Sequence, residues 1–218
     1  MAKVLLGIPT RSQLSCETSA YMAALSRRPD VSPMPVAGRP EDFCRNGLVR
    51  IFLSQPNLTH LFMLDSDIGP PLDALDRLLA LDAPLAAGRY SLLMGAGLRW
   101  SVSNCSGGKY RLMSELPSYT EPFECDGGGA GCLLIRRDVF DKVKWPWFKW
   151  IENADGSQTS EDIYFFKKAN LKGYRLKVDP AVICNHYKET NITALMLALT
   201  KNKKNPPANP DPQIINNQ

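Results

Sequence analysis

Long hydrophobic runs are missing from this sequence of 218 residues. The N-terminus carries one lysine and then an apolar stretch of only five residues before Pro9, which is too short for the hydrophobic region of a signal peptide. The longest apolar run elsewhere, residues 192–199, falls far below the roughly 20 residues that span a bilayer. We therefore expect no export and no membrane segment, and we place the protein in the cytoplasm.

Closely spaced cysteine pairs are also missing. None of the six cysteines forms a C-x-x-C pair, and Cys44, Cys132 and Cys184 lie in apolar segments. We interpret them as buried thiols in a reducing compartment, rather than as a disulfide framework or a zinc site.

A strong excess of one charge is missing too. The chain has 26 Lys and Arg against 22 Asp and Glu, a formal net charge of +4. This mild balance argues against a protein built mainly to bind nucleic acid, although it leaves room for a local basic patch. A hydrophobic content of 44% indicates a globular chain, long enough for one core. We expect a single domain over residues 1–204, followed by a Pro- and Asn-rich tail at 205–218.

Strand-like and helix-like segments alternate along the first 88 residues. We expect strands at 3–8, 31–36, 60–64 and 84–88, and helices at 14–27, 41–55 and 70–81. In the last helix, Leu72, Leu75, Leu78 and Leu79 fall on one face, behind two prolines suited to a first turn. This order predicts an α/β fold with a mostly parallel central sheet flanked by helices.

The second half has a different pattern. Residues 89–129 are typical of hairpins and loops. After them we expect a buried strand at 130–135, a short helix at 136–143, an aromatic loop at 144–150, a capped helix at 160–173, paired strands within 174–187 and a helix at 190–201.

Two acids follow the apolar strand at 60–64. Asp65-Ser66-Asp67 forms a D-x-D pattern, which is weak by itself because acids are common. Its position after a buried strand favours a role in ligand binding, since open α/β folds bind ligands at the carboxyl edge of a parallel sheet. Both carboxylates can converge there if a turn begins at Ser66, and a cation would then offset their repulsion. The structural alternative is a helix N-terminus that favours acids.

A second acidic pair and a histidine come later in the chain. Glu161 and Asp162 open the helix at 160–173, where acids in a first turn behind the Ser160 cap also suit helix stability alone. His186 is one of two histidines and lies at the end of the last strand pair. A lone histidine is commonly a structural residue, and we take His60 to be one.

Taken in order, these segments carry a resemblance. The strings FMLDSDI, GGGAGCLLIRRDVFDKV, PWF followed by SEDIYFFKKANLKGYRLKVDP, and CNHY are similar to those of glycosyltransferases of the A-type (GT-A) fold. The chain resembles small bacterial and phage-encoded relatives of the family 2 enzymes, from about Val4 to Tyr187. The resemblance implies a GT-A catalytic domain, with a nucleotide-binding half at 1–88 and an acceptor and metal half at 89–200, working in a bacterium or in the host cell of a phage.

The same resemblance implies the donor and the metal. A nucleotide-sugar, most plausibly a UDP-sugar, would bind with Mn²⁺ or Mg²⁺. Asp67 and His186 would be metal ligands, and Asp65 would share the metal or lie near the ribose. The nucleotide-binding residues implied are Pro9, Thr10, Arg11, Asp65 and Ser66. Carboxylate oxygens with one imidazole suit manganese at least as well as magnesium.

The resemblance further implies that Glu161 or Asp162 is catalytic and handles the acceptor hydroxyl, since a carboxylate within reach of that hydroxyl can take its proton. The sequence does not choose between them, nor between inversion and retention of anomeric configuration.

The aromatic loop is the candidate acceptor site. Trp145, Trp147 and Trp150 alternate with lysines, a pattern that can stack a sugar ring or an unstacked base. The structural alternative is a hydrophobic loop folded over the sheet edge. The acceptor would be a hydroxymethylated base of phage DNA or a glycan, and the oligomeric state stays open.

Three other functions compete with this interpretation. A module of the same fold could bind a nucleotide-sugar or glycan without turnover. A haloacid-dehalogenase-like phosphatase also has a D-x-D after a strand, but near the N-terminus and followed by Thr or Val, where this chain has Gly69. A nucleotidyltransferase would need a glycine-rich loop after the first strand, where this chain has one glycine.

Overall fold

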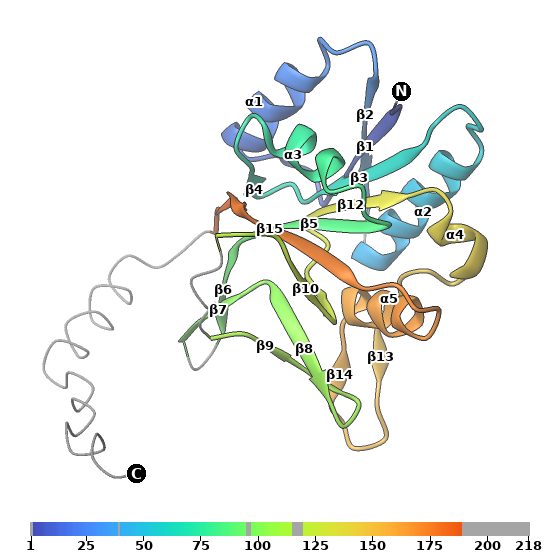
Figure 1. Ribbon diagram of the computed structural model, residues 1–218, viewed down its shortest axis with the longest axis vertical. Helices are drawn as coiled ribbons and strands as arrows, with labels where there is room; N and C mark the ends of the chain where they lie inside the picture. The colour runs from blue at the N-terminus through green and yellow to red at the C-terminus, as the bar shows by residue number, and fades with distance from the viewer. Residues whose placement is uncertain (1, 39, 95–96, 115–119, 189–218) are drawn as a thin grey trace, which may run out of the picture. The chain divides into compact units, whose positions relative to one another are not determined.

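A seven-stranded mixed sheet forms the centre of the protein in a computed structural model that describes residues 2–38, 40–94, 97–114 and 120–188 (Figure 1). Its strands, in spatial order, are β10 (Phe123–Cys125), β15 (Leu176–Ile183), β5 (Leu85–Arg89), β12 (Cys132–Arg136), β3 (His60–Leu64), β1 (Val4–Thr10) and β2 (Val31–Ala37). Strands β1, β2, β3, β5 and β15 share one direction, whereas β12 and β10 run against their neighbours. The predicted α/β class is confirmed, with two reversed strands in the sheet.

Helices cover both faces of this sheet. They are α1 (Cys16–Leu25), α2 (Glu41–Leu53), α3 (Ala74–Ala80), α4 (Val139–Lys142) and α5 (Glu161–Asn170). Residues of α1 and α3 pack with one set of alternate strand residues, and residues of α2, α4 and α5 pack with the other set. In β1, for example, Leu6 belongs to the first core and Leu5 to the second. The result is a three-layer fold, because strand side chains alternate between faces.

Short strands connect and extend the central sheet. They are β4 (Ile68–Gly69) paired with β16 (Asn185–His186), β6 (Ser91–Met94) with β7 (Gly97–Trp100), β8 (Val102–Ser106) with β9 (Lys109–Leu112) and β11 (Gly127–Gly128), and β13 (Ile151–Glu152) with β14 (Gln158–Thr159). The pairings β6–β7 and β8–β9 confirm the hairpins predicted within 89–129.

Two local expectations were wrong. Helix α3 begins at Ala74 and not at the two prolines, so Leu72 is 74% exposed while Leu75 and Leu78 are buried. The strands of 174–187 do not pair with each other, since β15 joins β5 and β10 while β16 joins β4. For the two strands, the partners that decide the outcome are distant in sequence.

Other expectations are met or lie outside the described residues. Cys44, Cys132 and Cys184 are buried and free, as predicted. The helix predicted at 190–201 and the tail at 205–218 lie outside the described residues, as does the end of the domain predicted at 204. Among the helices of the described segments, none is long and apolar enough to cross a membrane.

Candidate functional site

The turn after β3 places Asp65 and Asp67 at the edge of the sheet where its parallel strands have their carboxyl ends. The Ile68 N–H donates to the Asp65 carbonyl at 3.1 Å, which closes the turn predicted at Ser66. The Ser66 carbonyl accepts from the Ser15 N–H at 2.8 Å, at the start of α1. The turn is therefore held by its own backbone and by a neighbouring helix.

Asp67 lies beside His186. Strand β16 pairs with β4 so that His186 is opposite Ile68. His186 Nε2 lies 3.5 Å from Asp67 Oδ2, and Nδ1 lies 2.6 Å from the Ser91 carbonyl oxygen. Because a carbonyl oxygen only accepts, Nδ1 carries the hydrogen, and in the neutral ring Nε2 then presents its lone pair to the carboxylate. The fold thus brings Asp67 and His186, the two residues expected at a metal, close to each other.

Asp65 faces a different set of groups. Arg45 of α2 lies among three carboxylates: Nη2 is 3.0 Å from Asp65 Oδ1, and Nε is 3.3 Å from Glu161 Oε1 and 3.6 Å from Asp162 Oδ1. The Ser160 side chain caps α5 and begins the helix at Glu161, so both acids of its first turn reach Arg45. The two predicted acidic segments therefore meet through one arginine.

Burial shifts the protonation of this cluster. Removal from water raises the pKa of Asp162 to about 8, with Glu161 and Asp65 adding to the rise and Arg45 opposing it. The Tyr90 hydroxyl, which accepts from the Gly131 N–H at 3.1 Å, has a pKa well above its ordinary value for the same reason. A carboxyl group with a pKa near neutrality is suited to exchanging a proton with a substrate.

Tyr90 lies next to both parts of the site. Its ring meets the His186 ring edge-on at a centroid distance of 5.2 Å. A Cβ atom placed on Gly131 would come within 2.7 Å of the Tyr90 hydroxyl and 2.9 Å of Asp65 Oδ2. Gly131 therefore lets the hydroxyl and the carboxylate approach the backbone.

Arg45 was missed from the sequence, although a signal is present. It precedes the buried Leu48, Val49 and Phe52 by three, four and seven residues, so it lies on the apolar face of α2. A charged residue at such a position needs buried partners. Tyr90 carried no comparable signal.

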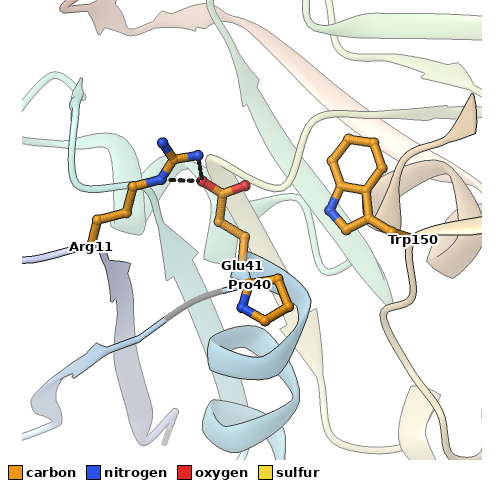
Figure 2. A pocket seen from close by; sticks show the side chains of 4 residues that line it. All are labelled: Arg11, Pro40, Glu41 and Trp150. Carbon is orange, nitrogen blue, oxygen red and sulfur yellow. Dashed lines mark hydrogen bonds and ion pairs between the residues drawn. The ribbon is translucent and has the colours of Figure 1, made fainter.

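The end of β1 lies beside the start of α2. Pro9 is buried, and the Thr10 hydroxyl donates to the Gln13 carbonyl at 2.8 Å. Arg11 Nη2 is 2.7 Å from Glu41 Oε1. Figure 2 shows this pair across an open pocket from Trp150.

Residues from the predicted nucleotide site and from the predicted acceptor site line this pocket. It has a volume of about 440 Å³ and is lined by Arg11, Pro40, Glu41 and Trp150. A residue expected at the nucleotide and one expected at the acceptor thus line the same hollow.

The other two tryptophans differ in exposure. Trp145 is 53% exposed with the Arg50 guanidinium 4.4 Å from its ring centroid. Trp147 is buried, its Nε1 donating to the Val143 carbonyl at 3.0 Å. Of the three tryptophans, one is therefore a core side chain and two have exposed rings.

The fit of a divalent metal can be judged from Asp67 and His186. In the part of the chain that the structure describes, no three His, Cys, Asp or Glu residues are grouped closely enough to hold an ion by themselves. An imidazole nitrogen and a carboxylate oxygen 3.5 Å apart can nevertheless share one ion at bond lengths of about 2.0–2.2 Å. Such ions commonly take one or two protein ligands and complete their shell with substrate phosphates and water. The residues present fit a metal that arrives with a diphosphate.

Comparison with known proteins supports the fold. No family model and no curated protein matches the sequence. Among solved structures, the chain is similar to A197 from STIV, with 17% identity, a TM-score of 0.60 and 86% of each chain covered. It is also similar to the GT-A glycosyltransferase GalNAc-T7, crystallised with UDP, GalNAc and Mn²⁺, with 11% identity, a TM-score of 0.55 and coverage of 88% of this chain and 45% of that one. The chain thus spans less than half of GalNAc-T7, and these likenesses show a fold shared with glycosyltransferases.

Proposed function

We propose that the protein is a metal-dependent glycosyltransferase that moves a sugar from a nucleotide-sugar, most plausibly a UDP-sugar, to an acceptor hydroxyl. The observation that carries the proposal is the convergence of three distant segments at one end of the sheet. Asp65 and Asp67 follow β3, Glu161 and Asp162 open α5, and His186 follows β15. The fold shared with a glycosyltransferase supports the same conclusion.

Asp67 and His186 are the proposed ligands of the Mn²⁺ or Mg²⁺ ion. When bound, the ion would stabilise the negative charge that develops on the leaving diphosphate. The Ser91 carbonyl orients the imidazole so that Nε2 faces Asp67. We assign Asp65 and Ser66, with Pro9, Thr10 and Arg11 at the end of β1, to the nucleotide.

Asp162 is a better candidate than Glu161 for the group that takes the acceptor's proton. The Glu161 side chain is 5% exposed and accepts from Arg45, whereas the Asp162 side chain is 18% exposed. In the proposed step the acceptor O–H bond breaks, its proton passes to Asp162, and the oxygen bonds to the anomeric carbon. The bond from that carbon to the diphosphate breaks, and UDP leaves with the electron pair. Attack in line with this bond would invert the anomeric configuration.

The acceptor side is proposed from the exposed rings of the aromatic loop. Trp150 is 42% exposed beside Arg11, and Trp145 is 53% exposed beside Arg50. Exposed indole rings next to cations can stack a sugar ring or a base. The proposed acceptor classes are a glycan and DNA with a hydroxymethylated base, and the buried Trp147 is left to support the loop.

Thermal unfolding with nucleoside diphosphates tests the proposal. UDP with Mn²⁺ should raise the melting temperature of the protein, and this shift should vanish in Asp67→Ala, because ligands that bind only the folded state stabilise it. Asp141→Ala, which removes an exposed acid from the first turn of α4, is the matched control and should keep the shift. No metal-dependent shift with UDP, GDP, CDP, ADP or dTDP would overturn the proposal.

Turnover separates an enzyme from a binding module. A transferase should slowly release UDP from a UDP-sugar in water with Mn²⁺ present. A metal-dependent shift without any such release would instead favour the binding module, and phosphate release from simple esters would favour a phosphatase.

A further inference from the structure

Arg45 is enclosed by carboxylates and still has one nitrogen without a hydrogen-bond partner. Its side chain is 4% exposed, with Nη2 beside Asp65 and Nε beside Glu161. Among the described residues, Nη1 is buried and makes no hydrogen bond. Buried guanidinium groups are rarely left in this state, because the unmade bond is not replaced by water.

Asp162 has the complementary unpaired atom. Within the same described segments, its Oδ1 is buried without a hydrogen-bond donor, and it lies 3.6 Å from Arg45 Nε. Nε and Nη1 belong to one planar guanidinium, so Asp162 Oδ1 lies within about 6 Å of Nη1, a span that one oxygen atom can bridge with two hydrogen bonds of about 3 Å. The unpaired donor and the unpaired acceptor therefore belong to one contact between Arg45 and Asp162.

The chemistry of these two atoms selects the ligand. A phosphate or carboxylate would accept from Nη1 but would be repelled by the carboxylates of Glu161 and Asp65. An ammonium group would donate to Oδ1 and leave Nη1 unpaired. A hydroxyl group both accepts and donates, so it satisfies both atoms.

Asp65 and Asp162 are the more exposed members of the cluster. Their side chains are 26% and 18% exposed, whereas those of Arg45 and Glu161 are 4% and 5% exposed. The solvent side of the cluster is therefore the side of Asp65 and Asp162, while Asp162 Oδ1 itself, like Arg45 Nη1, is buried.

We propose that Arg45 and Asp162 together bind the acceptor hydroxyl, with Nη1 donating to its oxygen and Oδ1 accepting its hydrogen. This inference rests on the proposed glycosyl transfer and adds Arg45 to the residues that contact the reacting oxygen. Glu161 and Asp65 are then positioning residues, since they hold the guanidinium. Donation from Arg45 favours loss of the hydroxyl proton, because the oxygen gains negative charge as that proton moves to Asp162.

Water serves as the minimal acceptor, so the test needs no knowledge of the natural one. Arg45→Lys keeps the positive charge but lacks the second arm of the guanidinium fork. Arg45→Lys should still bind UDP with Mn²⁺, because it keeps a positive charge beside Asp65, and its ratio of UDP-glucose to UDP affinity should equal that of the unsubstituted protein. Hydrolysis of UDP-glucose or UDP-GalNAc, whichever the unsubstituted protein turns over, should fall on the order of tenfold to a hundredfold. Asp141→Ala should change none of these quantities.

Three results would overturn the inference. One is unchanged hydrolysis in a folded Arg45→Lys variant together with a loss in Asp162→Ala, which would make Asp162 act without Arg45. Another is a fall in the UDP-glucose to UDP affinity ratio in Arg45→Lys, which would assign the hydroxyl to the donor sugar. The third is hydrolysis that neither substitution affects. Absence of Mn²⁺-dependent UDP binding by the unsubstituted protein would instead be a failure of the proposed function.

A crystal structure of the unsubstituted protein with UDP and Mn²⁺ provides a test that does not depend on a variant folding. It should show a water molecule within hydrogen-bond distance of both Arg45 Nη1 and Asp162 Oδ1. A direct contact between these two atoms, with no room for an oxygen between them, would overturn the inference.

Discussion

Arg45 shows how strongly a single buried charge depends on its neighbours. Its guanidinium lies within 3.6 Å of carboxylate oxygens from Asp65, Glu161 and Asp162. Removing the guanidinium leaves these carboxyl groups without their cation. Breaking a buried ion pair in this way lowers the free energy of unfolding more than removing an exposed charge does.

Arg45→Met should therefore lower the free energy of unfolding by about 3–5 kcal/mol, measured by urea denaturation at pH 7. Arg50→Met on the same helix is the control, because Arg50 is exposed and its guanidinium lies 4.4 Å from the centroid of the Trp145 ring. Its cost should be about 0.5–1 kcal/mol. Equal effects of the two substitutions would contradict this account of the cluster.

His60 predicts a pH dependence that is separate from the site. Burial and the charge of Arg136 lower its pKa in the folded protein, while Asp138 and Asp82 act in the opposite direction. The unfolded chain then binds more protons than the folded protein below the ordinary histidine pKa of about 6.5, so stability should fall as pH falls through this value.

This contribution of His60 is measurable by urea denaturation at pH 7.5 and pH 5.5. The loss of stability between the two values should be smaller in His60→Gln than in the unsubstituted protein. An identical loss in both would show that His60 does not titrate differently in the folded and unfolded states.

At the scale of single elements, local patterns placed most boundaries well. The strand predicted at 60–64 is β3, and the helix predicted at 41–55 is α2 at Glu41–Leu53. Apolar periodicity and the Ser160 cap act within a few residues, so they can be read directly from the sequence. The pairing of β15 and β16 could not be read in this way, because each pairs with a strand more than 90 residues away in the chain.

Helix α2 offers a prediction about its glycine. An added Cβ on Gly47 would meet only Val36 Cγ1, at 4.0 Å. Because alanine favours helices over glycine, Gly47→Ala should raise the free energy of unfolding by about 0.5–1 kcal/mol. Gly131→Ala should instead lower it by about 1–3 kcal/mol, since its Cβ would crowd Tyr90 and Asp65. Urea denaturation of both variants checks the contrast in sign.

At the scale of the molecule, the two predicted halves share one sheet. Strand β12 from the second half lies between β3 and β5 from the first half. The predicted boundary at residue 88 therefore separates two proposed roles, nucleotide binding and acceptor binding. It does not separate two structural units, because the sheet is continuous across it.

Residues 1–88 expressed alone should consequently lack a cooperative fold. Without β12 and β15, strand β5 loses both of its neighbours and β3 loses one, and the face that packs with α2, α4 and α5 keeps only α2. Circular dichroism should show no sharp thermal transition for this fragment, whereas the complete chain should show one. A cooperative transition in the fragment would indicate an independent nucleotide-binding unit.

The sequence by itself determined the α/β class and the order of most elements, and it supplied the acidic and histidine residues proposed for the candidate site. These depend on periodicity, caps and residue chemistry, which are properties of neighbours in the chain. Only the tertiary structure decided that Asp67 meets His186 while Asp65, Glu161 and Asp162 meet at Arg45. The physical reason is that these contacts follow from strand order and from the direction of α2 against the sheet, and both are fixed by core packing between distant segments.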